Sequence, residues 1–130
     1  MEQFYSQDIL VGIKIGTFSD GTNPVTDPNQ PLQVLALKHP AGKRIEIHTH
    51  TPHQRITHVL QKCLMVKKGE IRVELYGPDK KYMRDVALQE GDFFILINGA
   101  WGVSFLQDSE IIEIKNGPFK DDRIPLNTTL

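Results

Sequence analysis

The sequence predicts an all-β fold built from antiparallel strands. Short apolar or alternating runs recur along the chain from residue 32 onward, and turn-forming residues separate most of them, for example Lys68-Gly69 and Asn98-Gly99. Many short strands with regular turns are typical of an antiparallel sandwich or barrel. No stretch shows a convincing 3.6-residue period with a cap, which argues against helices.

The expected elements follow in chain order. Residues 7–18 predict one strand or two, interrupted by Gly12 and Gly16, and residues 19–31 are rich in turn formers and predict a loop. Further strands are expected at residues 32–38, 43–49, 58–66, 71–76, 85–88, 93–97, 103–106 and 111–115. The predicted organisation is an N-terminal strand and loop over residues 1–31, a barrel over 32–117 and an extended tail over 118–130.

Composition narrows the classes of partner. The chain has 130 residues, 39% of them hydrophobic, with Lys+Arg 15 against Asp+Glu 16 and a formal net charge of −1. This fits one globular domain without the field that would attract nucleic-acid phosphates or an anionic membrane, so neither partner is expected. The start lacks a secretory signal pattern, and the longest fully apolar run covers only residues 93–97.

Two further expectations concern compartment and assembly. Cys63 is the only cysteine, so it is expected to be a buried small hydrophobe, and a cytoplasmic location is the simplest interpretation. The run at residues 93–97 is apolar on both faces, as expected if one face fills a barrel and the other packs on a second sheet or subunit. A homodimer is therefore predicted.

Histidines are concentrated in one short stretch. Four of the five fall within eleven residues, and His48 and His50 form an H-x-H pair. Residues two apart on a strand point to the same face, so the pair would present two imidazoles side by side, as a metal chelate does. Arg44 and Glu46 would share that polar face, which could line a barrel mouth. The alternative is that these histidines are ordinary surface residues.

The spacing around this pair resembles the first motif of the cupin family, which are small β-barrels of the RmlC-like jelly-roll type. Gly42 is followed by five residues and then His48-Thr49-His50, and Lys62 is followed by six residues and then Gly69. Gly91-Asp92 with Asn98-Gly99 is similar to the frame of the second motif. The resemblance covers roughly residues 32–115 and implies a cupin-type antiparallel β-barrel.

Within the cupin family, the sequence most resembles a subgroup of small cupins that often accompany polysaccharide or nucleotide-sugar genes. The similarity rests on short phrases at residues 31–33, 40–42 and 113–118. It implies a small protein of poorly defined activity in carbohydrate or nucleotide-sugar metabolism.

Family membership would also imply a divalent metal, Zn, Fe, Mn or Ni, as a cofactor held by His48 and His50. Two departures weaken that implication, because Lys62 stands where the family has glutamate and the final histidine position falls on Trp101 or Gly102. A protonated ammonium repels a cation and accepts no hydrogen bond. Glu46, or a histidine from the long loop, could compensate, so both a metal site and a metal-free degenerate pocket stay open.

The surroundings of the histidines favour an anionic ligand. Five basic residues lie between positions 38 and 62, against the single acid Glu46. The predicted pocket contains Arg44, Glu46, Lys62 and Trp101, and a carboxylate, a phosphate or the pyrophosphate of a nucleotide sugar would suit it. Trp101 would add a stacking wall for a base or sugar ring. A solvated basic face is the alternative.

Three functional classes remain open at this point: an enzyme with or without a metal, a binding module and a purely structural protein. A metal-free sugar enzyme would need His48 or His50 as general base, with Tyr76 or Tyr82 as a possible acid. A metal-dependent isomerase, epimerase or dioxygenase would use the bound cation. A binding module would hold a small anionic metabolite without turnover, and an interior closed by side chains would favour a purely structural role.

Overall fold

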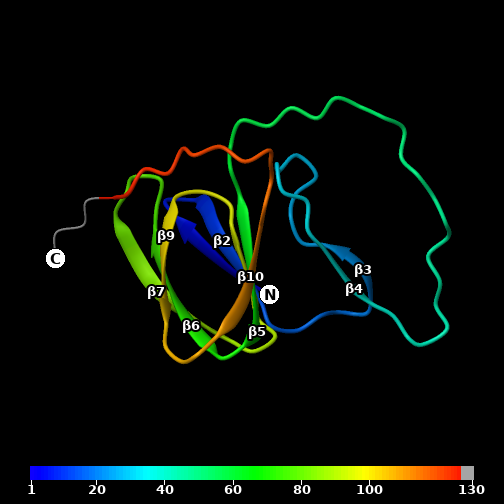
Figure 1. Ribbon diagram of the computed structural model, residues 1–130, viewed down its shortest axis with the longest axis horizontal. Helices are drawn as coiled ribbons and strands as arrows, with labels where there is room; N and C mark the ends of the chain where they lie inside the picture. Colours follow the sequence, from blue (N-terminus) through cyan, green and yellow to red (C-terminus); the bar gives the residue numbers. More distant parts are fainter. Residues whose placement is uncertain (127–130) are drawn as a thin grey trace.

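The computed structural model describes residues 1–126, and in this range the chain forms ten strands and no helix (Figure 1). Every paired set of strands is antiparallel, so the predicted all-β antiparallel class is confirmed. Across those residues, nothing helical is present that is long and apolar enough to cross a membrane.

The strands form two larger sheets and one hairpin. The five-stranded sheet has the order β1 (Glu2–Ser6), β2 (Ile9–Ile15), β8 (Phe93–Leu96), β5 (Lys62–Lys68), β10 (Glu110–Lys115). The three-stranded sheet has the order β7 (Tyr82–Gln89), β6 (Glu70–Tyr76), β9 (Ala100–Phe105). The hairpin pairs β3 (Gly21–Pro24) with β4 (Leu35–Lys38).

Buried and partly exposed side chains alternate strictly along β6, the central strand of the three-stranded sheet. In β6, Ile71, Val73 and Leu75 are fully buried, whereas the residues between them are partly exposed. Because successive side chains of a strand point to opposite faces, one face of this sheet is apolar and the other is polar. The apolar face packs against the five-stranded sheet.

Both larger sheets contribute to one core. Phe94 is fully buried, and its ring lies 5.8 Å from that of Phe4 and 5.9 Å from that of Trp101. The other buried members are Val11, Leu64, Val66, Ile71, Val73, Leu75, Val86, Leu88 and Leu96. Full burial of each such side chain contributes about 1.5–3 kcal/mol relative to exposure. The space between the sheets is therefore filled by apolar side chains.

A second apolar cluster lies on the outer face of the five-stranded sheet. Its buried members are Ile13, Ile15, Cys63, Ile95 and Ile97. Val25, Leu32 and Val34, which flank the hairpin strands, pack against it. The two-sided apolar character of residues 93–97 is thus satisfied within one chain, by the core on one face and this cluster on the other.

Each side of the sandwich is bounded by the last strands of the two larger sheets. On one side these strands are β1 and β7, and the guanidinium of Arg84 in β7 lies 5.0 Å from the ring of Phe4 in β1. On the opposite side, β9 and β10 are the last strands of their sheets, and no other strand within residues 1–126 pairs with their free edges. We call these two free edges the open seam.

The predicted elements agree with the structure in part. Residues 7–18 contain one strand, β2, which is one of the two predicted alternatives, and a turn at Gln7 and Asp8, both with positive φ, precedes it. Other elements need correction. β1 itself begins earlier than any expected strand. The predicted loop over 19–31 contains β3, and the strand expected over 58–66 begins only at Lys62. Residues 116–126 of the expected tail contain no strand, and residues 127–130 lie outside the described residues.

The burial of Cys63 changes the ionisation of its thiol. The side chain is buried, as predicted, and removal from water raises the pKa of its thiol to about 11. An unfolded thiol ionises near pH 9, so between pH 9 and 11 the thiolate favours the unfolded chain and folding stability falls as pH rises. Between these pH values, the free energy of unfolding is expected to fall by about 1–2 kcal/mol less in Cys63→Ala than in the wild type, as measured by urea unfolding titrations. Parallel losses in both proteins would contradict this assignment.

Candidate functional site

The segment carrying the predicted histidine site is not a strand. Residues 39–60, which we call the arm, contain no strand and are exposed throughout (Figure 1). The prediction of a strand over 43–49 was therefore wrong, because an alternating sequence becomes a strand only when a neighbouring backbone pairs with it. Arg44, Glu46, His48 and His50 consequently share no strand face, and all four are exposed.

The two histidines of the H-x-H pair nevertheless lie near each other. Their ring centroids are 5.2 Å apart in an edge-to-face arrangement, and His48 Nδ1 lies 2.7 Å from the carbonyl oxygen of Glu46. A metal site of the implied kind needs at least one further protein ligand. In the part of the chain that the structure describes, no three metal-ligating side chains come together. Two imidazoles alone do not fit the implied metal.

Lys62 and Trp101, the remaining members of the predicted pocket, do lie together. Lys62 Nζ is 5.7 Å from the centroid of the Trp101 ring and 3.9 Å from Glu113 Oε1. Lys62 and Leu64 have the same parity on β5, so Lys62 lies on the inward face at the end of the core. The lysine is partly buried there and its ammonium stays at the mouth of the sandwich, as amphipathic side chains usually do.

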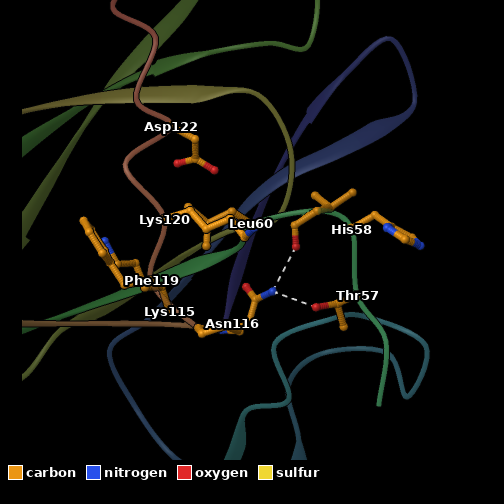
Figure 2. Close-up of a pocket in the computed structure, with 11 residues that line it drawn as sticks. Thr57, His58, Leu60, Lys115, Asn116, Phe119, Lys120 and Asp122 are labelled. Atoms are coloured by element: carbon orange, nitrogen blue, oxygen red, sulfur yellow. Dashed lines mark hydrogen bonds between the residues drawn. The ribbon is translucent and has the colours of Figure 1, made fainter. Parts of the chain in front are cut away.

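A cavity of about 390 Å³ lies beside this mouth. It is formed where the returning end of the arm meets the chain that follows β10 (Figure 2). The lining residues are Thr57, His58, Val59, Leu60, Lys115, Asn116, Gly117, Pro118, Phe119, Lys120 and Asp122. Its volume is in the range of small-molecule sites.

Asn116 holds the two walls of the cavity together. Its Nδ2 donates to the carbonyl oxygen of Val59 at 3.0 Å and to Thr57 Oγ1 at 3.2 Å, and its Oδ1 accepts from the amide of Gln61 at 2.8 Å (Figure 2 shows the first two bonds). A primary amide can make such bonds on both sides at once. The geometry of the cavity therefore depends on this one side chain.

Positive charge gathers around the cavity and the mouth. Lys115 lines the cavity and is the direct cross-strand partner of Lys62 on β5. Its Nζ lies 5.5 Å from the centroid of the Phe119 ring, so each of the two lysines faces an aromatic ring. Lys120 adds a third cation and Asp122 an anion. Cross-strand like charges destabilise a sheet, which makes a bound anion favourable here.

Sequence reasoning missed the C-terminal half of this region. The cavity residues after β10 follow the phrase Asn116-Gly117-Pro118, which carried a resemblance but no chemical role. The register of β10 on β5 places Lys115 opposite Lys62. The spacing of residues within either strand does not encode this register, so no signal for the pair was present in the sequence.

The tyrosines considered as possible acids lie elsewhere. Tyr76 has the outward parity of β6, and its ring lies 5.8 Å from that of Tyr82 in β7. Tyr82 Oη donates to Asp85 Oδ1 at 3.0 Å, and this hydrogen bond raises the pKa of the Tyr82 phenol. Both rings lie on the outer face of the three-stranded sheet, away from Lys62 and Trp101.

The fold and the site together define an all-β protein of antiparallel sheets with a cavity at one end of its sandwich, which Lys115, Lys120, Asp122 and Phe119 help to line. Comparison with protein-family models, with curated proteins and with solved structures finds no match to this chain.

Proposed function

We propose that this protein binds a small anionic or sugar-type metabolite at the end of its sandwich, in carbohydrate or nucleotide-sugar metabolism. The observation that carries the proposal is the cross-strand pairing of Lys62 with Lys115, each beside an aromatic ring, next to a cavity of about 390 Å³. Lys115 and Phe119 line this cavity, whereas Lys62 and Trp101 lie outside its lining. The resemblance to small cupins of polysaccharide gene clusters supports the sugar class of ligand.

Charge favours an anion over a neutral ligand. Lys62, Lys115 and Lys120 outnumber the nearby acids Glu113 and Asp122. The separation of Lys62 Nζ and Glu113 Oε1 is 3.9 Å, longer than a strong charge-assisted hydrogen bond, so the ammonium can turn to a ligand. A phosphate or pyrophosphate would accept hydrogen bonds from two lysines at once.

The aromatic rings favour a ligand with a flat or apolar part. Trp101 lies under Lys62, and Phe119, which is 77% exposed, lies under Lys115. An exposed ring can stack on a sugar or a base while the adjacent ammonium binds the phosphate. A nucleotide sugar combines these features, whereas free phosphate provides only the charge.

Thermal unfolding with three probes tests the proposal. A ligand that binds only the folded chain stabilises it by about 2.7 kcal/mol at one hundred times its Kd, a rise in Tm of several degrees for a domain of this size. We expect UDP-glucose to raise Tm most, inorganic phosphate less and glucose not at all, with ionic strength held constant by sodium chloride. Equal responses to UDP-glucose and glucose would contradict an anion site.

Two matched double variants test whether the rise in Tm with UDP-glucose depends on Lys62 and Lys115. Lys62→Gln/Lys115→Gln removes the paired ammonium groups and is expected to abolish the response to UDP-glucose. Lys67→Gln/Lys68→Gln makes the same change in charge at the other end of β5, where Lys67 pairs with Glu110, and is expected to leave it intact. Loss of the response in the second variant, or its survival in the first, would place binding elsewhere.

A further inference from the structure

We propose that the arm of a second copy of this chain completes the open seam and brings His48 and His50 to the site at the mouth of the sandwich. The seam and the arm have complementary features. The arm is a strand-like sequence without a partner, and the seam consists of two free edges that no described strand covers. Unpaired edges of this kind readily accept another strand.

The apolar faces of the two elements match. Ile45 and Ile47 alternate along the arm and are 59% and 88% exposed. Ile112 and Ile114 lie on the outer face of β10, with the parity of Cys63 and Met65 on β5, and are 47% and 52% exposed. Pairing of the arm along β10 would bury isoleucines against isoleucines.

The polar faces match in charge as well. If Ile45 and Ile47 face outward beside β10, Arg44, Glu46, His48 and His50 face inward by parity. That inward side of the seam carries Glu113, and Lys62 and Trp101 lie next to it. Arg44 and Glu46 then face a side that carries both an acid and a lysine, and the two imidazoles arrive beside the proposed ligand.

The anchoring of the arm favours a second copy over the arm's own sandwich. Gln61 is buried at the end of the arm, and its Oε1 accepts from the amide of Leu32, so both ends of the excursion are held on the outer side of the five-stranded sheet. From this base the hairpin and the arm extend away from both larger sheets (Figure 1). An element that projects from its own body is the usual starting point for exchange between copies.

Size and cross-linking test the exchange without any ligand. Wild-type protein is expected to have twice the mass of one 14.8 kDa chain by gel filtration with light scattering. In a Cys63→Ala background, chains with Ile47→Cys and chains with Ile112→Cys are mixed, unfolded, refolded together and oxidised. A disulfide-linked mixed dimer is expected. Chains with Ile9→Cys, an exposed position on β2, replace those with Ile112→Cys as the control and are expected not to cross-link.

Three outcomes would overturn the exchange. The first is a monomeric wild type. The second is a double variant, Ile47→Cys/Ile112→Cys, that forms its disulfide within one chain, because this places the arm on its own sandwich. Ile45→Glu/Ile47→Glu is expected to be monomeric with unchanged circular dichroism, whereas Ile124→Glu, at an 83% exposed position, stays dimeric. A dimeric arm variant would also contradict the proposal.

Mixed chains test the delivery of the histidines, which rests on the proposed ligand site. One chain carries His48→Ala/His50→Ala and the other Lys62→Gln/Lys115→Gln, and each is expected to bind UDP-glucose at least tenfold more weakly than wild type. In a refolded mixture, each heterodimer regains one intact site only if the histidines come from the partner. Absence of rescue while wild type binds would overturn the delivery of the histidines. Absence of binding by wild type would instead overturn the proposed function and leave the cross-linking result standing.

Discussion

Replacing Phe94 with alanine is expected to lower the free energy of unfolding by about 3–5 kcal/mol. Phe94 is fully buried in β8, and its ring lies beside that of Phe4 in the same sheet and that of Trp101 in the opposite sheet. Truncation would remove the transfer free energy of the ring and leave a cavity that the surrounding strands cannot close. Urea unfolding monitored by circular dichroism measures the change.

A matched phenylalanine provides the control. Phe105 ends β9 and is 58% exposed, so Phe105→Ala is expected to change stability by less than about 1 kcal/mol. A loss below about 1 kcal/mol for Phe94→Ala would contradict a filled interior, and would indicate a hollow sandwich with room for a ligand between its sheets.

Gln61→Leu is expected to destabilise the chain by about 2–4 kcal/mol. The Gln61 amide is buried, accepts from the amide of Leu32 and donates to Gln30 Oε1 and to the carbonyl oxygen of Ile97. Leucine fills a similar volume but leaves two backbone groups without their partner in a dry environment. Urea unfolding measures the loss.

The effect of this change should also be local. Hydrogen exchange is expected to accelerate at residues 25–34, which pack on the outer cluster beside Gln61. Gln107→Leu, at an exposed position between β9 and β10, serves as the control and should change neither quantity by much. Stability near that of wild type in Gln61→Leu would show that this side chain does not anchor the base of the arm.

The strands from β5 to β10 could be predicted because each combines an apolar or alternating run with a turn at its end. Gly69 and Gly91, both with positive φ, mark two of these turns. β1 was missed because only Phe4 in it is buried, which gives no visible period. β3 consists of residues typical of turns, and its ladder with β4 decides its conformation. Long-range pairing was the missing information in both cases.

The candidate site, like the fold, could be predicted from the sequence only in part. The expectation that Lys62 and Trp101 share a pocket came from their positions in the resemblance to the cupin motifs, and the two side chains do lie together. The prediction of a strand over residues 43–49 was wrong because the alternating sequence there has no partner strand within the described residues. Lys115 and Asn116 could not be found without the register of β10 on β5. An alternating pattern thus predicts which side chains share one face of a strand, and only the pairing of strands decides what that face packs against.

An anion that binds at the cationic mouth should shift the amide resonances of the residues around it. Uniformly nitrogen-15-labelled protein is titrated with UDP-glucose and, separately, with glucose. We expect saturable shifts for UDP-glucose at Lys62, Trp101 and the cavity segments 57–60 and 115–122, and none for glucose. Saturable shifts confined to residues outside this region, or the absence of any shift, would contradict binding at the mouth.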